Sequence, residues 1–434
     1  MERLISLLVL IFVLFIHACT PSLEQEFVTS DISHFWEAYD QIVATTDTVE
    51  QERLLNELYL QKGSPGLESI MEVRNYTPAE YLQAIRNYPQ FWESIRTQTT
   101  TVGQHLPIIE NHLQMLKEAY PELQPAPVYF TIGAFRTGGT AHEGKVLIGT
   151  ELSLANQETV IDELPEWRQP FYRTSVPVDD LPLLCTHEYI HTQQSELQND
   201  LLSRCLYEGV AEYVSCLATN LPSSSPAIAF GQANQERVIE KFVVDLFSRS
   251  NDYNWMWGEN TNELQVRDLG YYIGYEICER YYQNAEDKPA AIRELIQLDF
   301  TQQDKIEQLV DNSGLLPKPI AVLREEYEQS RPTVIEVENF ANGSTDVDPS
   351  LKTITVRFSE PLNGYHAGID FGPLGEEYCP KMDPLGRSWG ETGETYTVAV
   401  SLEAGQQYQF AISSSFRTEK GTRLQPYVIK FQTR

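Results

Sequence analysis

A helical segment near the middle of the chain reads Leu183-Leu184-Cys185-Thr186-His187-Glu188-Tyr189-Ile190-His191. His187 and His191 are spaced one helical turn apart, so both imidazoles lie on one face and can reach a single ion. Neutral imidazole is a good ligand for zinc. The apolar residues Leu183, Leu184 and Ile190 predict that this helix is seated in a protein core.

Two carboxylates that follow in the sequence are candidates for the other roles at a zinc site, one as a general base and one as a ligand. Glu188 is expected to point to the side of the metal where a water would lie, which is the place for a general base. A catalytic zinc takes three protein ligands and keeps one position open. Glu208 is the candidate third ligand, because its distance from His191 allows a turn and a return along a second, antiparallel helix.

Glu212 lies one turn beyond Glu208, on the same helix face. There it can accept the free N–H of a ligand histidine and fix its tautomer. The alternative is an exposed acid that pairs along its own helix.

These motifs carry a resemblance to known proteins. The His187–His191 motif, followed by Glu208-Gly209-x-Ala211-Glu212-Tyr213, resembles the gluzincins, whose third ligand is a Glu on the next helix. The latter string is similar to that of thermolysin-like aminopeptidases. Most of residues 31–282 resemble a bacterial family labelled only as predicted zinc-dependent proteases. That resemblance implies His187, His191 and Glu208 as zinc ligands and implies no substrate. It also includes Phe35-Trp36-x-Ala38-Tyr39, Gly138-Gly139-Thr140 and Gly270-Tyr271-Tyr272-x-Gly274.

A tyrosine is the last candidate for a catalytic role. The aminopeptidases resembled here carry a transition-state tyrosine three residues before a helical glycine. Tyr271 matches that position relative to Gly274, and Tyr272 is the second candidate. A phenol there can donate to the developing oxyanion. The alternative is that both tyrosines are core residues, beside glycines that permit close helix packing.

Composition excludes some classes of partner. The chain has 434 residues, with 32 basic and 62 acidic side chains and a formal charge of −30. Nucleic-acid binding needs Lys and Arg to displace counterions, so no nucleic-acid partner is expected. A polybasic grip on anionic lipid is disfavoured for the same reason.

The first residues predict export. An apolar run, Leu4 to Ile16, is too short to span a bilayer comfortably and leads into Ile16-His17-Ala18-Cys19. This junction resembles a bacterial lipobox, which implies cleavage before Cys19 and a lipid anchor on it. The expected location is the bacterial cell envelope, facing the periplasm or the surface. An ordinary cleaved signal peptide is the alternative. The other five cysteines cannot all pair within one chain, and most are interpreted as buried hydrophobes.

The pattern along the chain predicts an α+β protein. Residues 1–18 are the signal peptide, 19–330 a mainly helical metallopeptidase domain with a small β-sheet, and 331–434 a β-sandwich. Runs at 128–132 and 145–149 predict strands, joined by 136–144 as a hairpin or edge-strand pair. The resemblance implies a gluzincin, thermolysin-like fold for the first domain. The β runs of the second, at 353–358, 395–400, 407–412 and 427–431, resemble bacterial Ig-like modules.

The function predicted is zinc-dependent hydrolysis of peptide bonds in a peptide or protein substrate, with Glu188 moving the proton. An edge strand near Gly138-Gly139-Thr140 is expected to pair with extended substrate. The alternative is a lipid-anchored binding or scaffold protein with a non-catalytic zinc site. That site would need a fourth protein ligand. The Gly-x-Met-Glu-Asn segment of the aminopeptidases is absent, which favours an endopeptidase or a protease of narrow specificity.

Overall fold

The computed structural model describes residues 23–174, 176–247, 252–257 and 263–434. The predicted signal peptide and Cys19 lie outside these residues. None of the helices described is long and apolar enough to cross a membrane. The chain divides into two compact units: unit 1 takes in the described residues up to 195 with 210–224 and 285–298, and unit 2 comprises the described parts of 196–209, 225–284 and 299–434.

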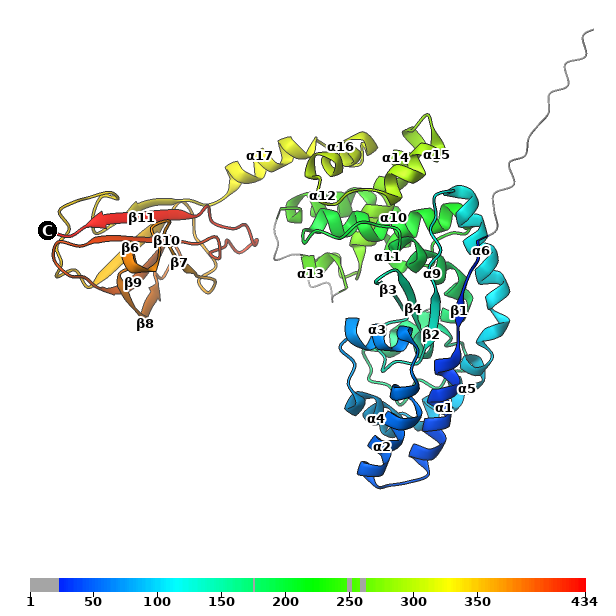
Figure 1. Cartoon of the computed structure of the whole chain (residues 1–434). Coiled ribbons are helices and arrows are strands. Elements are labelled where there is room, and N and C mark those ends of the chain that lie inside the picture. Colours follow the sequence, from blue (N-terminus) through cyan, green and yellow to red (C-terminus); the bar gives the residue numbers. More distant parts are fainter. Residues whose placement is uncertain (1–22, 175, 248–251, 258–262) are drawn as a thin grey trace, which may run out of the picture. The chain divides into compact units, whose positions relative to one another are not determined.

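The sheet of unit 1 has the strand order β1-β2-β4-β3 (Figure 1). β1 (Phe27–Val28) is parallel to β2 (Val128–Thr131), and β2 is parallel to β4 (Lys145–Gly149). β3 (Gly139–His142) is antiparallel to β4 and forms one edge. The two predicted β runs are therefore parallel neighbours rather than the two arms of a hairpin.

A tight turn joins β3 to β4. Its two residues, Glu143 and Gly144, have φ of 46° and 71°, as a two-residue hairpin turn of this hand requires. The stretch 136–144, which connects the two predicted strands, thus contains the edge strand expected near Gly138-Gly139-Thr140. The sequence left the bounds of this strand open, because Gly139-Thr140-Ala141-His142 has little of the β-branched and aromatic character that marks a strand.

Helices cover this sheet, and their apolar faces build the core of unit 1. Phe35 and Tyr39 of α1 pack on Trp92 of α5, with 5.0 Å between the Phe35 and Trp92 ring centroids. Thr77 and Glu80 form a reciprocal cap at the start of α4, and Pro78 occupies its first helical position. The helices are α1 (Ser30–Val43), α2 (Thr48–Leu58), α3 (Pro65–Val73), α4 (Pro78–Asn87), α5 (Pro89–Thr100), α6 (Leu106–Ala119), α7 (Thr150–Ser153), α8 (Gln169–Thr174) and α15 (Lys288–Ile296).

Two consecutive helices carry the predicted ligands. α9 (Pro177–His191) begins with proline in its first turn and packs against β3, β4 and α6. Most of its side chains are buried, in accord with the core position predicted for it. α10 (Leu201–Thr219) is one continuous helix whose residues before 210 belong to unit 2 and whose later residues belong to unit 1.

Glycines bring α10 and α14 (Leu269–Asn284) together within unit 2. A Cβ on Gly274 would lie 1.7 Å from the Cys205 carbonyl oxygen, and one on Gly209 would lie 2.1 Å from the Gly274 carbonyl carbon. Only glycine permits this approach. The remaining helices of the unit are α11 (Pro226–Ala233), α12 (Gln235–Asp245), α13 (Asp252–Trp255), α16 (Gln303–Ser313) and α17 (Ile320–Ser330).

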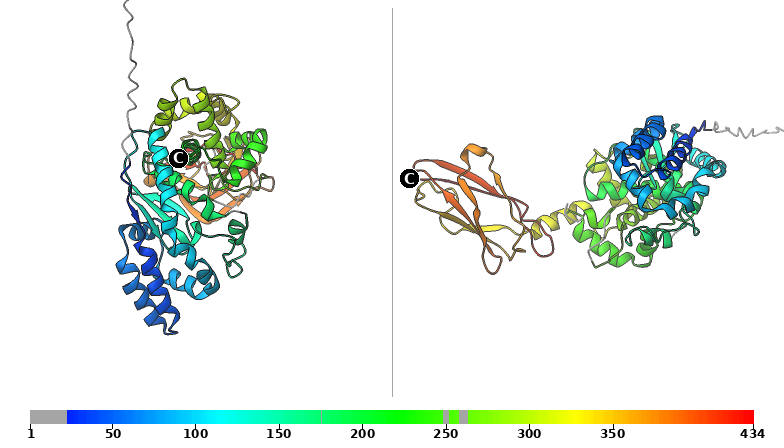
Figure 2. Two further views of the ribbon diagram at one scale, coloured as in Figure 1. Left: turned by 90° about the vertical axis from the view of Figure 1, so that its right-hand side faces the viewer. Right: turned by 90° about the horizontal axis from the view of Figure 1, so that it is seen from below.

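Two sheets after α17 enclose one apolar core, and they can be followed in Figure 2. Their strand orders are β5-β6-β9-β8 and β11-β10-β7. The four β runs predicted from the sequence correspond to β6, β9, β10 and β11. The strands are β5 (Val334–Val337), β6 (Thr353–Phe358), β7 (Ile369–Phe371), β8 (Lys381–Trp389), β9 (Thr395–Ser401), β10 (Gln407–Ile412) and β11 (Tyr427–Gln432).

Candidate metal centre

The side chains of His187, His191 and Glu208 come together as one group. One ligand atom from each lies within 4.8 Å of the others. His187 and Glu208 are 7% exposed, and His191 is partly buried. Two imidazoles and a carboxylate are a donor set that suits zinc. The described residues thus bring together the three side chains that the sequence predicted as ligands.

Hydrogen bonds orient both imidazole rings. His187 Nδ1 lies 2.9 Å from Glu212 Oε2, and His191 Nδ1 lies 2.6 Å from Gln194 Oε1. Both partners are oxygens that only accept, so each Nδ1 carries the proton and each Nε2 keeps its lone pair. The two Nε2 atoms are 3.1 Å apart. Both lone pairs are therefore available at one place, as a shared ion requires.

Glu212 is itself held. Its other carboxylate oxygen accepts a hydrogen bond from the Ser223 hydroxyl, so both oxygens have a partner. Burial raises the pKa of nearby Asp180, and the charge of Glu212 adds to that rise. Ser223 and Gln194 did not enter the sequence interpretation. Gln194 follows His191 at helical spacing, which is the signal that could have found it; Ser223 lies beyond the end of α10 and has no such signal.

Glu188 lies beside the edge strand. It is 7% exposed and is not one of the three grouped ligands. A Cβ on Gly139 of β3 would lie 2.9 Å from both Cγ and Oε1 of Glu188. The absence of a side chain at residue 139 lets the strand backbone reach this carboxylate. Cys185 is fully buried, and burial raises the pKa of its thiol, which favours the inert, protonated form.

Tyr271 and Tyr272 occupy different surroundings. The Tyr271 hydroxyl hydrogen-bonds to the Glu208 carboxylate and accepts from Trp257 Nε1 at 3.3 Å. Burial and then the Glu208 charge raise the pKa of Tyr271 well above its usual value, so it remains a donor. Tyr272 is fully buried, packs on Gly231 and accepts from Gln235 Nε2 at 3.1 Å. Of the two candidates, Tyr271 is the one beside a predicted ligand.

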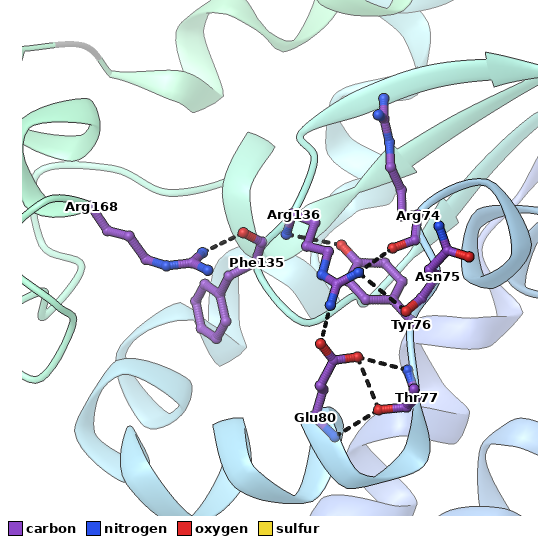
Figure 3. A network of polar contacts seen from close by, with 8 residues as sticks. All are labelled: Arg74, Asn75, Tyr76, Thr77, Glu80, Phe135, Arg136 and Arg168. Atoms are coloured by element: carbon purple, nitrogen blue, oxygen red, sulfur yellow. Dashed lines mark hydrogen bonds and ion pairs between the residues drawn. The ribbon is translucent and has the colours of Figure 1, made fainter. Parts of the chain in front are cut away.

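A polar network anchors the loop that leads into β3 (Figure 3). The backbone N–H of Arg136 donates to the Tyr76 hydroxyl at 3.0 Å, and its guanidinium donates to the carbonyls of Arg74 and Asn75 and to Glu80. The preceding residue, Phe135, has φ of 68°, a rare conformation for a bulky side chain.

Buried Glu151 also fixes this loop, through hydrogen bonds to its backbone. Its carboxylate accepts the backbone N–H groups of Gly133 at 2.8 Å and Phe135 at 3.1 Å, while Arg168 donates to the Phe135 carbonyl. Burial raises the pKa of Glu151 in spite of these bonds. Such an over-determined loop fixes where β3 begins, and therefore where Gly139 meets Glu188. Arg136 and Glu151 had no signal in the sequence, because they act through distant segments.

Comparison with known proteins adds one finding about this region. Residues 171–301 match a family described as a predicted Zn-dependent protease. The matched segment contains all of α9 and α14 and all of the predicted ligands. No curated protein gives a significant match.

Two solved structures of surface-layer protein SbsC also match, at 12% sequence identity. One is of SbsC residues 31–844, with 76% of this chain and 46% of that chain covered; the other is of domains 1–6, with 75% and 45% covered. This chain thus spans about half the length of those structures. The TM-score is 0.18 in both cases, so the likeness carries no argument about fold or function.

Proposed function

We propose that this protein is a zinc metallopeptidase of the gluzincin type, with His187, His191 and Glu208 as metal ligands. One observation carries the proposal: both histidine Nδ1 atoms are engaged by acceptor oxygens, and the two Nε2 atoms meet 3.1 Å apart beside Glu208. The match of residues 171–301 to a predicted Zn-dependent protease family supports it. A structural zinc would need a fourth protein ligand, and the group formed by the described residues has three.

The residues divide the work as follows. Bound zinc would supply Lewis acidity and a water of lowered pKa. Glu188, buried beside the ligands, takes a proton from the attacking water and passes it to the leaving amine. Glu212 and Gln194 keep the ligand rings in place. Tyr271, protonated and next to Glu208, is the proposed donor to the oxyanion of the transition state.

The position of β3 at the edge of the sheet supports a peptide as the substrate. Gly149 N donates to Gly138 O at 3.0 Å, and the β3–β4 register pairs Thr140 with Leu147. Because hydrogen-bonding direction alternates along a strand, Gly139 and Ala141 direct their backbone groups away from β4. The Gly139 carbonyl already accepts from the Thr137 hydroxyl, so an extended peptide can pair with the Gly139 N–H and the Ala141 backbone and cross the face on which Glu188 lies.

The remaining parts of the proposal rest on sequence. Cys19 is proposed as a lipidated N-terminus that tethers the enzyme in the bacterial cell envelope, and the C-terminal sheets as an Ig-like module. The absence of an aminopeptidase-type amine-binding segment favours an endopeptidase. Mass spectrometry of membrane-extracted protein tests the anchor: a mature chain that begins elsewhere contradicts it.

Metal analysis combined with peptide-library cleavage tests the central proposal. Glu188→Gln keeps the side-chain size and removes the base, so zinc content should be unchanged while activity falls by ~10²- to 10⁴-fold. His191→Ala and Glu208→Ala should instead lose zinc. Glu158→Gln, at an exposed turn, is the matched control and should behave as wild type. Full zinc occupancy in Glu208→Ala, or normal cleavage by Glu188→Gln, contradicts the assignment.

A further inference from the structure

The C-terminal sheets hold a group of basic residues that peptide hydrolysis does not use. Arg417, Arg423 and His366 form this group, called here the basic cluster. The chain as a whole carries 62 acidic and 32 basic side chains, so carboxylates are abundant as partners. Within the described residues, however, neither guanidinium of the cluster forms an ion pair. Nearby Arg331 contrasts with them, because it pairs with Glu328 at 2.8 Å.

The backbone brings the two arginines face to face. In the segment that connects β10 to β11, they form an isolated antiparallel bridge. Beside it, the Thr418 N–H donates to the Thr422 carbonyl at 3.0 Å. Residues opposite each other in such a bridge project to the same side. Their neighbours Phe416 and Leu424 are fully buried in the core between the sheets. Side chains alternate along a strand, so Arg417 and Arg423 project away from that core.

His366 belongs to the same surface. Asn363 N donates to the Arg417 carbonyl at 2.9 Å, and the Asn363 side-chain oxygen accepts from His366 N at 3.1 Å. Asn363 Nδ2 lies 2.9 Å from His366 Nδ1 and can only donate to it. The imidazole proton therefore sits on Nε2, as a donor. Tyr365 is 70% exposed, and its ring centroid lies 4.8 Å from that of His366, with the two rings tilted by 46°.

The cluster carries unmet hydrogen-bonding capacity and unmet charge. The Nε atoms of Arg417 and Arg423 are both buried, and none of the described residues supplies either of them with an acceptor. Burial and then the Arg423 charge lower the pKa of Arg417, and both arginines lower the pKa of His366 after burial does. Like charges placed opposite each other on a β-bridge repel. An anion between them would relieve the repulsion and accept the free donors.

We propose that the basic cluster is a binding site for a phosphate group. Two guanidinium forks and an imidazole N–H match the oxygens and the charge of about −2 of a phosphate better than those of a single carboxylate. The phosphate can be free or carried by a lipid headgroup. This site is independent of the proposed zinc chemistry and of its outcome.

Calorimetric titration of the full-length protein with inorganic phosphate tests the site. Arg417→Gln/Arg423→Gln should weaken phosphate binding by about 10- to 100-fold, since hydrogen bonds to charged groups are removed. Arg357→Gln is the control: it removes one positive charge from the same part of the chain, but from an arginine paired with Glu336 and Glu338. It should bind as wild type.

A second measurement guards against a misfolded variant. Without phosphate, the double variant should melt no lower than wild type, because a repulsive pair is lost; added phosphate should raise the melting temperature of wild type only. Flotation with phosphatidylcholine vesicles, with and without phosphatidic acid, uses the Cys19→Ser form and separates headgroup from free phosphate. Phosphate binding by the double variant at wild-type strength, or equal loss in Arg357→Gln, overturns the proposal. The proposal is also overturned if the wild-type protein binds neither inorganic phosphate nor the vesicles that contain phosphatidic acid.

Discussion

His187 Nδ1 lies 2.9 Å from Glu212 Oε2, and the second oxygen of Glu212 accepts from Ser223. Glu212 stands one helical turn after Glu208 on α10. The same helix thus supplies a predicted ligand and the group that orients another ligand. This arrangement ties the direction of the His187 lone pair to the position of α10, and it makes the effect of changing Glu212 predictable.

Glu212→Gln should lower zinc affinity by about 10- to 100-fold. The change keeps the shape but replaces a charged acceptor with a neutral amide, which holds the Nδ1–H tautomer less firmly. Competition with a chelator measures the affinity. Glu158→Gln, an exposed acid-to-amide change, is the control and should leave zinc binding unchanged. Wild-type zinc affinity in Glu212→Gln would show that this carboxylate does not hold the ring.

The two adjacent tyrosines should separate catalysis from stability. Tyr271→Phe removes a donor beside Glu208 and should reduce kcat by ~10²- to 10³-fold, as loss of an oxyanion donor does, with zinc retained. Tyr272→Phe breaks only a buried contact with Gln235 and should cost about 1 kcal/mol of stability, with kcat unchanged. Steady-state kinetics and urea unfolding measure both. The reverse pattern would assign the role to Tyr272.

Gly139→Ala should impair cleavage although it is a small change. Its Cβ would lie 2.9 Å from Glu188 Oε1 and 3.0 Å from Leu184 Cδ1, so either the base or the edge strand must move. A misplaced base or substrate costs on the order of 10²-fold in rate. Gly138→Ala is the control, since its nearest atoms are at 3.8 Å and 3.9 Å. Equal activity of the two variants would argue against contact between this strand and the reacting groups.

His112 should make the protein less stable in mild acid. It lies on α6, 7% exposed, and burial lowers its pKa despite a hydrogen bond to the Pro182 carbonyl. The unfolded chain then takes up a proton at about pH 6.5, before the native state does. Well above about pH 6.5, the titration of His112 therefore does not change the free energy of unfolding. As the pH falls through about 6.5, it lowers that free energy and destabilises the protein.

Urea unfolding at pH 7.5 and pH 5.5, values that bracket about pH 6.5, measures this effect. His112→Gln should lose less stability on acidification than wild type does. His105→Gln, which changes a histidine at the N-terminus of the same helix, should keep the wild-type pH dependence. If His112→Gln also loses as much stability as wild type, the acid sensitivity arises elsewhere.

The amino-acid sequence by itself determined most of the elements and the candidate ligand set. Helical spacing alone places His187 and His191 on one face, and turn-rich alternation alone predicts β6, β9, β10 and β11. These are local properties, set by side-chain periodicity over a few residues. For the same reason the weakly patterned β3 was expected only as an edge strand near Gly138-Gly139-Thr140, and the parallel pairing of β2 and β4 was not predicted.

Only the tertiary structure decided which distant groups meet. It distinguished Tyr271 from Tyr272, although the two are adjacent in the chain, because α14 turns one phenol to Glu208 and buries the other against Gly231. It joined Glu212 to Ser223 and brought Gly139 against Glu188. Such contacts depend on the packing of whole helices and strands, and no short-range pattern encodes how a helix face is turned toward residues far away in the chain.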